Sequence, residues 1–137
     1  MVDAVALDTN ALMMPVELDV RLFDELDRLL GGASGGDGST GFEPIVPQSV
    51  VEELRRLSDS GGEEGIAASV GHDLATDRCL AVDTEASYAD DAVVELAREG
   101  QVDYVVTNDG PLQDRVTDAG VPVIALRASN KLAITRP

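Results

Sequence analysis

The chain has 137 residues, which suits one domain, and 44% of them are hydrophobic but only 3% aromatic, so its core must be aliphatic. Its single cysteine, Cys79, excludes an intrachain disulfide and a cysteine-based zinc site, and its 26 acidic and 10 basic residues give a formal net charge of −16. No apolar run reaches the roughly 20 residues of a membrane span, and the first residues lack the pattern of a signal peptide, so we expect a soluble protein of the cytoplasm.

Strand and helix signals alternate along the first part of the chain. The apolar run at 2–7 predicts a buried strand, and the apolar residues at 19–30 recur at helical spacing with charged residues on the other face. The Gly/Ser-rich stretch at 31–41 predicts a loop. A short strand at 43–47 then leads to a helix at 49–57, whose Ser-Val-Val-Glu opening matches a capping box.

The same alternation continues along the rest of the chain. The remaining predicted elements are a helix at 63–77, a strand at 79–82, a helix at 89–99, a strand at 102–107, a helix at 111–119, a strand at 122–126 and a small edge strand at 131–135. Strands joined through helices favour parallel pairing, with helices on both faces of the sheet. The sequence therefore predicts a single α/β domain over residues 1–137, in three layers around a central, mainly parallel sheet.

Polar residues follow two of the predicted strands at the point where each strand ends. Asp8-Thr9-Asn10 follows the first strand, and Thr107-Asn108-Asp109 follows the strand that begins at residue 102. Ligands of such sheets bind beyond the carboxyl ends of the strands. Two acids delivered to neighbouring strand ends repel each other unless a cation or a shared proton neutralises them.

Two predicted helices begin with further acids. Glu53 lies near the start of one, and Asp91 near the start of the other, with Asp90 as an alternative to Asp91. If both helix starts point at the strand ends, four carboxylates converge there. A set of oxygen ligands without His or Cys suits Mg²⁺ or Mn²⁺, and carboxylate-held metal ions of this kind activate water for phosphodiester hydrolysis.

Four segments of the chain resemble the acidic motifs of PIN domains, in the order and with the spacing of that family. They are LDTNAL at 7–12, VVEEL at 50–54, ADDAVVELA at 89–97 and VVTNDGPLQDRV at 105–116. The resemblance implies a PIN-like α/β/α fold and a Mg²⁺- or Mn²⁺-dependent endoribonuclease acting on single-stranded RNA. It also implies PIN-type homodimers as a possible assembly.

The resemblance assigns roles to particular residues. The catalytic, metal-binding acids would be Asp8, Glu53, Asp91 and Asp109. The residues that support them would be Asn10, Asp90, Thr107 and Asn108, with Asp90 sharing or taking the third position as the alternative. From the residues alone, Arg55 and Arg56 could reach an RNA phosphate, although the composition favours their pairing with the abundant surface acids.

The tail indicates a branch of the family. GVPVIALR at 120–127, followed by Lys131-Leu132, is similar to archaeal PIN proteins related to the rRNA-processing nuclease of the small-subunit processome, as is YADD at 88–91. This similarity implies a role in rRNA processing. PLQD at 111–114 departs from the basic residues usual in that branch, which leaves Asp114 as either an outer acid of the site or part of an acidic surface.

Two other functions stay open at this stage. A VapC-type toxin would share the acids and the chemistry and would have an antitoxin as its partner, whereas a silent PIN scaffold would bind RNA or protein without cleaving. The charge does not decide between them. An acidic chain with one lysine is typical of a halophilic source, where salt screens the repulsion between the protein and RNA.

Overall fold

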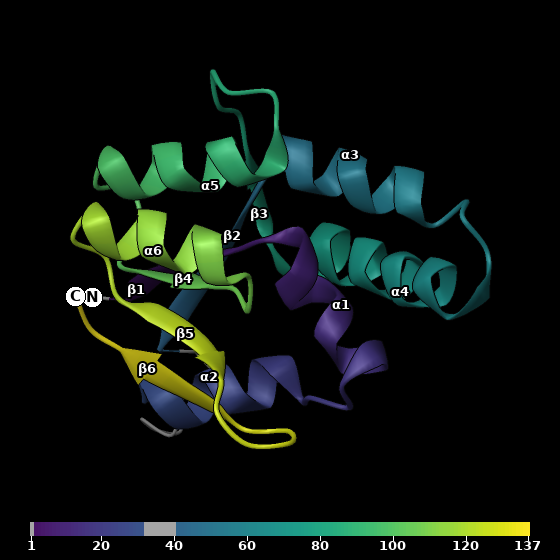
Figure 1. Cartoon of the computed structure of the whole chain (residues 1–137), viewed down its shortest axis with the longest axis horizontal. Helices are drawn as coiled ribbons and strands as arrows, with labels where there is room; N and C mark the ends of the chain where they lie inside the picture. Colours follow the sequence, from purple (N-terminus) through teal and green to yellow (C-terminus); the bar gives the residue numbers. More distant parts are fainter. Residues whose placement is uncertain (1, 32–40) are drawn as a thin grey trace.

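The computed structural model describes residues 2–31 and 41–137 (Figure 1), so positions 32–40 of the predicted Gly/Ser-rich loop lie outside the described residues. The strands are β1 (Asp3–Leu7), β2 (Phe42–Pro47), β3 (Leu80–Val82), β4 (Tyr104–Val106), β5 (Val123–Leu126) and β6 (Leu132–Thr135). The helices are α1 (Thr9–Glu17), α2 (Leu22–Leu30), α3 (Gln48–Leu57), α4 (Gly62–Arg78), α5 (Ala89–Arg98) and α6 (Gly110–Asp118). The described elements form the predicted α/β fold.

The six strands form one sheet in the order β3-β2-β1-β4-β5-β6. All neighbours run parallel except β5 and β6, so the predicted edge strand closes the sheet as an antiparallel hairpin. β1 and β4 are neighbours, with Leu7 opposite Val106. The carboxyl ends of these two strands therefore lie side by side, and each is followed at once by an acidic motif.

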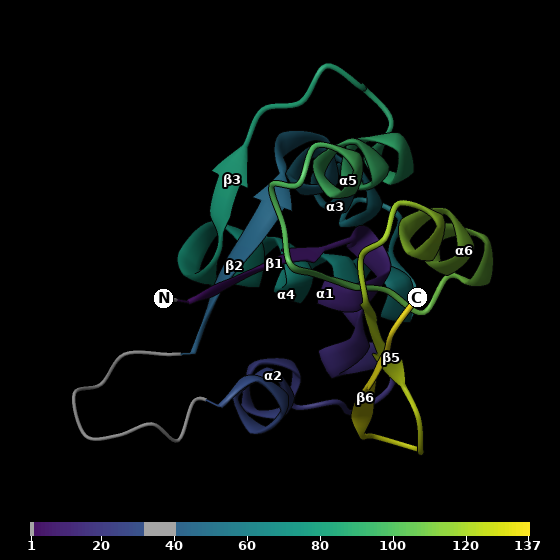
Figure 2. The same cartoon turned by 90° about the vertical axis from the view of Figure 1, so that its left-hand side faces the viewer.

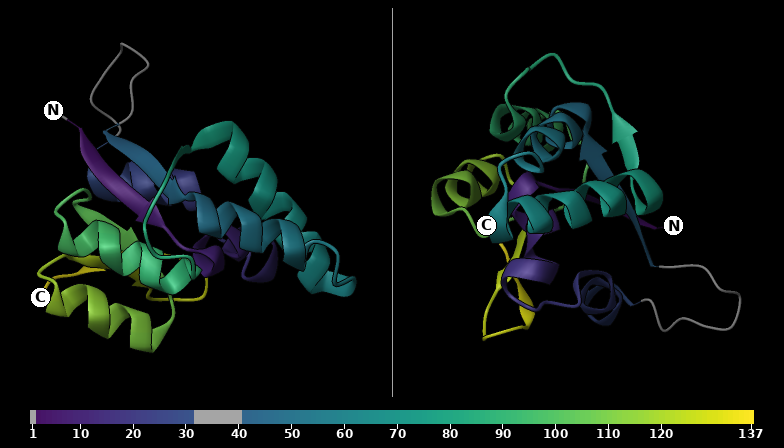
Figure 3. Two further views of the ribbon diagram at one scale, coloured as in Figure 1. Left: turned by 90° about the horizontal axis from the view of Figure 1, so that it is seen from above. Right: turned by 90° about the vertical axis from the view of Figure 1, so that its right-hand side faces the viewer.

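Helices cover both faces of this sheet. α5 and α6 lie side by side over one face, and α2 lies on the other, beneath β6 (Figures 1 and 2). α4 passes close to both α1 and α3 (Figure 3). The sheet is buried between these layers: Val5, Ala6 and Leu7 of β1 have no exposed surface.

Gly71 explains how α4 approaches α1 so closely. A Cβ atom built on Gly71 would lie 2.8 Å from the carbonyl oxygen of Leu12 and 3.1 Å from Cδ2 of Leu54. Glycine is unfavourable inside a helix, but here it permits the helix crossing. The contact holds α1 against α4, and Asp8 is the N-cap of α1.

Glu25 fastens the C-terminal hairpin to α2. Its buried carboxylate accepts hydrogen bonds from Arg28 at 2.7 Å and from the backbone N–H of Leu132 at 2.9 Å, and Lys131 lies 3.6 Å away. Arg28 also donates to the Leu132 carbonyl. Glu25 thus holds the hairpin of β5 and β6, whose sequence indicated a branch of the family, against α2.

The structure corrects two predictions, about α3 and α1. The predicted capping box is absent, because β2 passes into α3 without a turn: Pro47 is the N-cap, and the Ser49 hydroxyl has no hydrogen-bond partner. Residues 9–17 form α1, a helix for which the sequence analysis had no element. No helix in the described ranges is long and apolar enough to cross a membrane.

Candidate active site

Asp8 lies where the central strand β1 passes into α1. Its carboxylate caps that helix, because Oδ1 accepts a hydrogen bond from the Ala11 N–H at 2.7 Å. The residue is only 3% exposed, and burial raises its pKa from 3.8 to about 7, although hydrogen bonds from Thr107 and Ala11 oppose the rise. The negative charges of Asp90 and Asp109 raise it further. Among the described residues, no positive charge contributes to the pKa of Asp8.

Asp109 repeats this arrangement at the end of the neighbouring strand. It caps α6 by accepting a hydrogen bond from the Leu112 N–H at 3.1 Å, and its own N–H donates to Thr107 Oγ1 at 3.0 Å. Thr107 is fully buried and also hydrogen-bonds to Asp8. One threonine thus contacts both acids.

Asn10 and Asn108 join the two turns that carry these acids. The backbone N–H of Asn108 donates to Asn10 Oδ1 at 3.1 Å. The Asn108 side chain accepts from the Leu126 N–H at 2.8 Å and contacts the Met14 sulfur at 3.1 Å. The predicted supporting residues Asn10, Thr107 and Asn108 therefore all lie in hydrogen bonds around the two strand ends.

Glu53 reaches the same place from α3. Its carboxylate accepts a hydrogen bond from the hydroxyl of Thr9, and Thr9 directly follows Asp8 in the chain. Glu52, its neighbour in the chain, is exposed and lines a different pocket, between α3 and the loop that precedes α5. The helical turn between the two glutamates separates them.

Asp90 and Asp91 begin α5 but point to different surroundings. Asp90 lines the same pocket as Asp8, Glu53 and Asp109, and burial together with the charges of Asp109 and Glu53 raises its pKa. Asp91 instead forms an ion pair with Arg115, at 2.9 Å. Asp90 therefore lies with Asp8, Glu53 and Asp109, as in the alternative assignment, and Asp91 lies outside their pocket.

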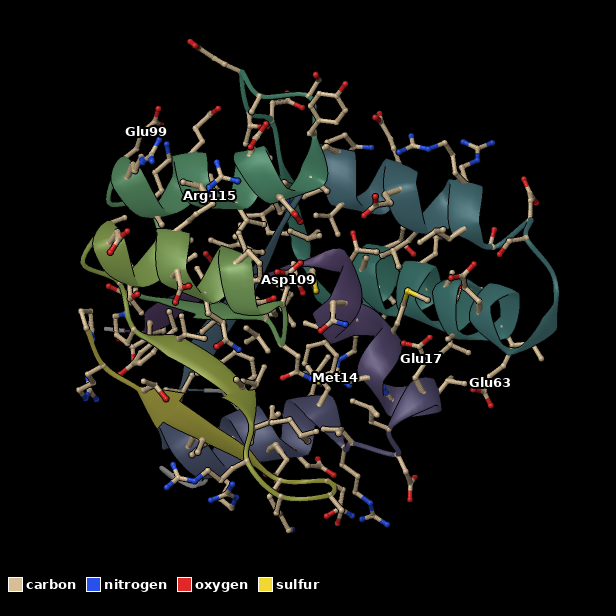
Figure 4. All side chains as sticks on the ribbon, in the orientation of Figure 1. Met14, Glu17, Glu63, Glu99, Asp109 and Arg115 are labelled. Atoms are coloured by element: carbon tan, nitrogen blue, oxygen red, sulfur yellow. The ribbon has the colours of Figure 1, made fainter. Side chains whose placement is uncertain are left out.

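The acids line one pocket of about 290 Å³, which Asp109 approaches from the start of α6 (Figure 4). Its described lining is Asp8, Thr9, Asn10, Met13, Glu17, Glu53, Leu57, Glu64, Asp90 and Asp109, without Lys, Arg or His. The sequence motifs did not predict Glu17 and Glu64 as site residues. Recognition of α1 would have found Glu17, because Asn10, Met13 and Glu17 follow one another on one face of a helix.

The donor chemistry of this pocket suits a divalent cation. Carboxylates are the ligands that Mg²⁺ and Mn²⁺ prefer, and burial, followed by the charges of neighbouring acids, raises the pKa values of Asp8 and Asp90. Within residues 2–31 and 41–137, no three His, Cys, Asp or Glu side chains are arranged closely enough to hold an ion. Glu53, Asp8 and Asp109 each accept a hydrogen bond, from Thr9 or from a helix start, so a cation would compete with these donors for carboxylate oxygens.

Three residues considered in the sequence analysis lie outside this pocket. Arg55 and Arg56 are exposed near the end of α3, and neither lines the pocket. Asp114 is exposed on α6 and does not line it either. The structure therefore brings Asp8, Glu53, Asp90 and Asp109 together, and it separates these four from Asp91, Arg55, Arg56 and Asp114.

Comparison with known proteins identifies the family of the chain. The chain is 30% identical over 123 residues to ribonuclease VapC4 of Methanocaldococcus jannaschii, which covers 88% of this chain and 87% of that protein. The structure of this chain is similar to that of the PIN domain endonuclease Utp24, with a TM-score of 0.75 and 24% identity. The match covers 98% of this chain and 92% of the other. A domain of a functionally unknown protein from M. jannaschii gives a TM-score of 0.60 at 17% identity, over 92% of both chains. The model of the PIN like domain family matches residues 5–129, and the chain therefore belongs to the PIN-like domain family.

Proposed function

We propose that this protein is a metal-dependent endoribonuclease that hydrolyses phosphodiester bonds in single-stranded RNA. The observation that carries the proposal is the lining of one pocket by Asp8, Glu53, Asp90 and Asp109, which come from four separate motifs. The relative named ribonuclease VapC4, similar over most of both chains, supports RNA as the substrate.

The four acids have different parts in the proposed site. Asp8 and Asp109, held at neighbouring strand ends, would bind a Mg²⁺ or Mn²⁺ ion directly, and Glu53 and Asp90 would complete its shell. A divalent cation there supplies the positive charge that activates a water nucleophile and stabilises the leaving oxygen. Asp90 replaces Asp91 in this assignment, because Asp91 is engaged by Arg115.

The surrounding residues position these acids. Thr107 contacts Asp8 and the backbone of Asp109, so it sets the spacing of the two carboxylates. Thr9 holds Glu53 when no cation is bound, and it would release that carboxylate when one binds. The Asn10–Asn108 hydrogen bond keeps the two turns in register.

Cleavage of a labelled single-stranded RNA tests this proposal. Wild type should cut the strand with Mn²⁺ and stop when EDTA is added, and Asp8→Asn and Asp109→Asn should each lose at least about a hundredfold in rate. Asp114→Asn is the matched control, because it removes the same charge from an exposed position on α6. Cleavage that survives in Asp8→Asn would exclude the mechanism.

We propose processing of rRNA precursors as the biological role, because the tail at 120–132 resembles the archaeal branch linked to that process. The similarity to ribonuclease VapC4 favours a toxin ribonuclease as the second candidate. The two roles predict different phenotypes. Deletion should leave uncut rRNA precursors in the first case, whereas expression without an antitoxin should arrest growth in the second.

A further inference from the structure

A second pocket lies beside the acidic one, in the seam between α5 and α6. Its volume is about 380 Å³, and both Arg98 of α5 and Arg115 of α6 line it. The two pockets meet at the start of α5, where Asp90 lines the acidic pocket and Asp91 lines the second one. A strand that leaves the acidic pocket along this side therefore meets arginine side chains next.

Arg115 is held in place at this boundary. Its guanidinium donates to Asp91 Oδ1 at 2.9 Å, and the two side chains are 41% and 48% exposed. An ion pair so exposed contributes at most about 1 kcal/mol to stability. The guanidinium has five N–H donors in a planar fork, so donors remain for a second acceptor after Asp91 has engaged one.

Arg115 is also close to the site of the proposed chemistry. Its charge lowers the pKa of Asp90, against the burial and the negative neighbours that raise it. Along α6 it is six residues beyond Asp109, which corresponds to about 9 Å of helix. Figure 4 shows both side chains on α6, with Arg115 directed towards α5. Asp109 and Arg115 thus lie one after the other along the side of α6 that faces α5.

We infer that Arg115, positioned by Asp91, binds a backbone phosphate of the RNA strand next to the phosphate held at the acidic pocket. The inference rests on the proposed ribonuclease function and adds to it the path of the strand, along the seam between α5 and α6. Arginine suits this task because its fork matches two phosphate oxygens at once.

The acids of this pocket limit how the phosphate is attracted. Glu85 and Glu99 also line it, and Glu95 accepts hydrogen bonds from the backbone N–H groups of Glu85 and Ala86 at 3.0 and 2.9 Å. The pocket therefore lacks a net positive field. Recognition of the phosphate therefore depends on short-range hydrogen bonds from Arg115. We expect Arg115 to contribute one phosphate contact to the salt dependence of RNA binding.

Equilibrium binding of a short fluorescein-labelled single-stranded RNA tests the inference. Binding is followed by anisotropy at several salt concentrations in otherwise wild-type protein, with Ca²⁺ in place of Mn²⁺ so that the acidic pocket holds a cation while the strand stays intact. Arg115→Gln should weaken binding about five- to tenfold and make the slope of log K against log salt shallower by about 0.7, the value for one phosphate of a single strand. Arg115→Lys should keep the slope and lose part of the affinity, because it keeps the charge without the fork.

Arg136→Gln is the matched control. It removes the same charge from a position beside Tyr104. Tyr104 begins β4, whereas the acids lie at the other end of the strands, after their last residues. If Arg115→Gln binds RNA with the affinity and slope of Arg136→Gln, the inference is overturned, while cleavage by the wild type keeps the ribonuclease proposal intact. If the wild type neither binds nor cleaves the strand with Mn²⁺, both fall. Equal melting temperatures of the variants would establish that a change in slope does not reflect unfolding.

Discussion

Asp90 and Asp91 are adjacent at the start of α5, yet Asp90 lines a pocket with five other carboxylates and Asp91 pairs with the guanidinium of Arg115. A step of one residue turns a side chain by about 100° around a helix, which is enough to place neighbouring acids in different pockets. The same turn gives them opposite electrostatic surroundings. Asp90 lies among negative charges, whereas Asp91 has a positive partner.

This difference predicts separate effects on metal binding. Asp90→Asn should weaken Mn²⁺ binding about tenfold or more, because it removes a carboxylate from the acidic pocket. Asp91→Asn should change Mn²⁺ affinity by less than about twofold, since its carboxylate is engaged by Arg115. Isothermal titration calorimetry with Mn²⁺ measures both. The reverse order of the two affinities would return the third position to Asp91.

Asp8 should destabilise the metal-free protein at neutral pH. Its pKa is about 7 in the folded state against 3.8 as a free group, so the folded state binds its proton more tightly than the unfolded state does. Its contribution to the free energy of unfolding therefore falls as pH rises from about 4 to about 7. Asp8→Asn, which still accepts the Ala11 hydrogen bond, should gain about 2–4 kcal/mol above pH 7.

Urea unfolding in EDTA, at about pH 5 and about pH 8, measures this effect. Mn²⁺ should then stabilise the wild type but not Asp8→Asn, because ligands that bind only the folded state raise its stability. A metal-free Asp8→Asn variant that is less stable than wild type at about pH 8 would show that Asp8 has a partner in solution.

Glu25 should show the opposite dependence on pH. The hydrogen bond from Arg28, aided by the Leu132 N–H and the charges of Arg28 and Lys131, lowers its pKa from 4.5 to about 2. Its stabilising contribution is thus complete above about pH 4.5 and is lost as pH falls towards 2. Glu25→Gln should cost about 3 kcal/mol at neutral pH, because it leaves the partners of a buried carboxylate uncompensated.

Thermal unfolding at neutral and at acid pH checks the Glu25 prediction, since the difference from wild type should shrink as the pH falls. Lys131→Gln is the control: the Lys131 side chain is 62% exposed and its ammonium lies 3.6 Å from Glu25, so its loss should cost less than about 1 kcal/mol. If Glu25→Gln lowered the free energy of unfolding equally at every pH, the charge of the Glu25 carboxylate would contribute nothing to stability.

Gly71→Ala should destabilise the fold by about 1–3 kcal/mol, because its Cβ would press on the Leu12 carbonyl and on Leu54. Chemical unfolding measures the change. Gly110→Ala serves as the comparison, since a Cβ at that helical position meets nothing within 4 Å and should shift stability by less than about 0.5 kcal/mol. Equal costs for the two variants would contradict the close crossing of α4 and α1.

The sequence predicted the strands well because most of them are short apolar runs followed by polar residues. It missed α1, where Ala11 to Met14 are all buried and Pro15 lies inside the helix, because an unbroken apolar run has no helical period to detect. It began the next helix three residues early, at Asp19, which adopts a left-handed φ of 53° before α2. Periodicity gives the type of an element more reliably than its ends.

The candidate site was predictable in part for a similar reason. Asp8 and Asp109 follow buried strands, so the topology of a parallel sheet places them together. The choice between Asp90 and Asp91 depends on the rotation of α5 about its own axis, which packing against α6 decides. Glu64 reaches the pocket from α4, an element whose position no local pattern defines.

The most direct test of the central claim is a crystal of this protein soaked in millimolar Mn²⁺ and examined for anomalous density. We expect a peak within coordination distance of both Asp8 and Asp109, with Glu53 turned away from Thr9 and Asp90, rather than Asp91, facing the ion. Density that appears only outside this pocket, or no density while the pocket is open to solvent, would contradict a metal site formed by these four acids.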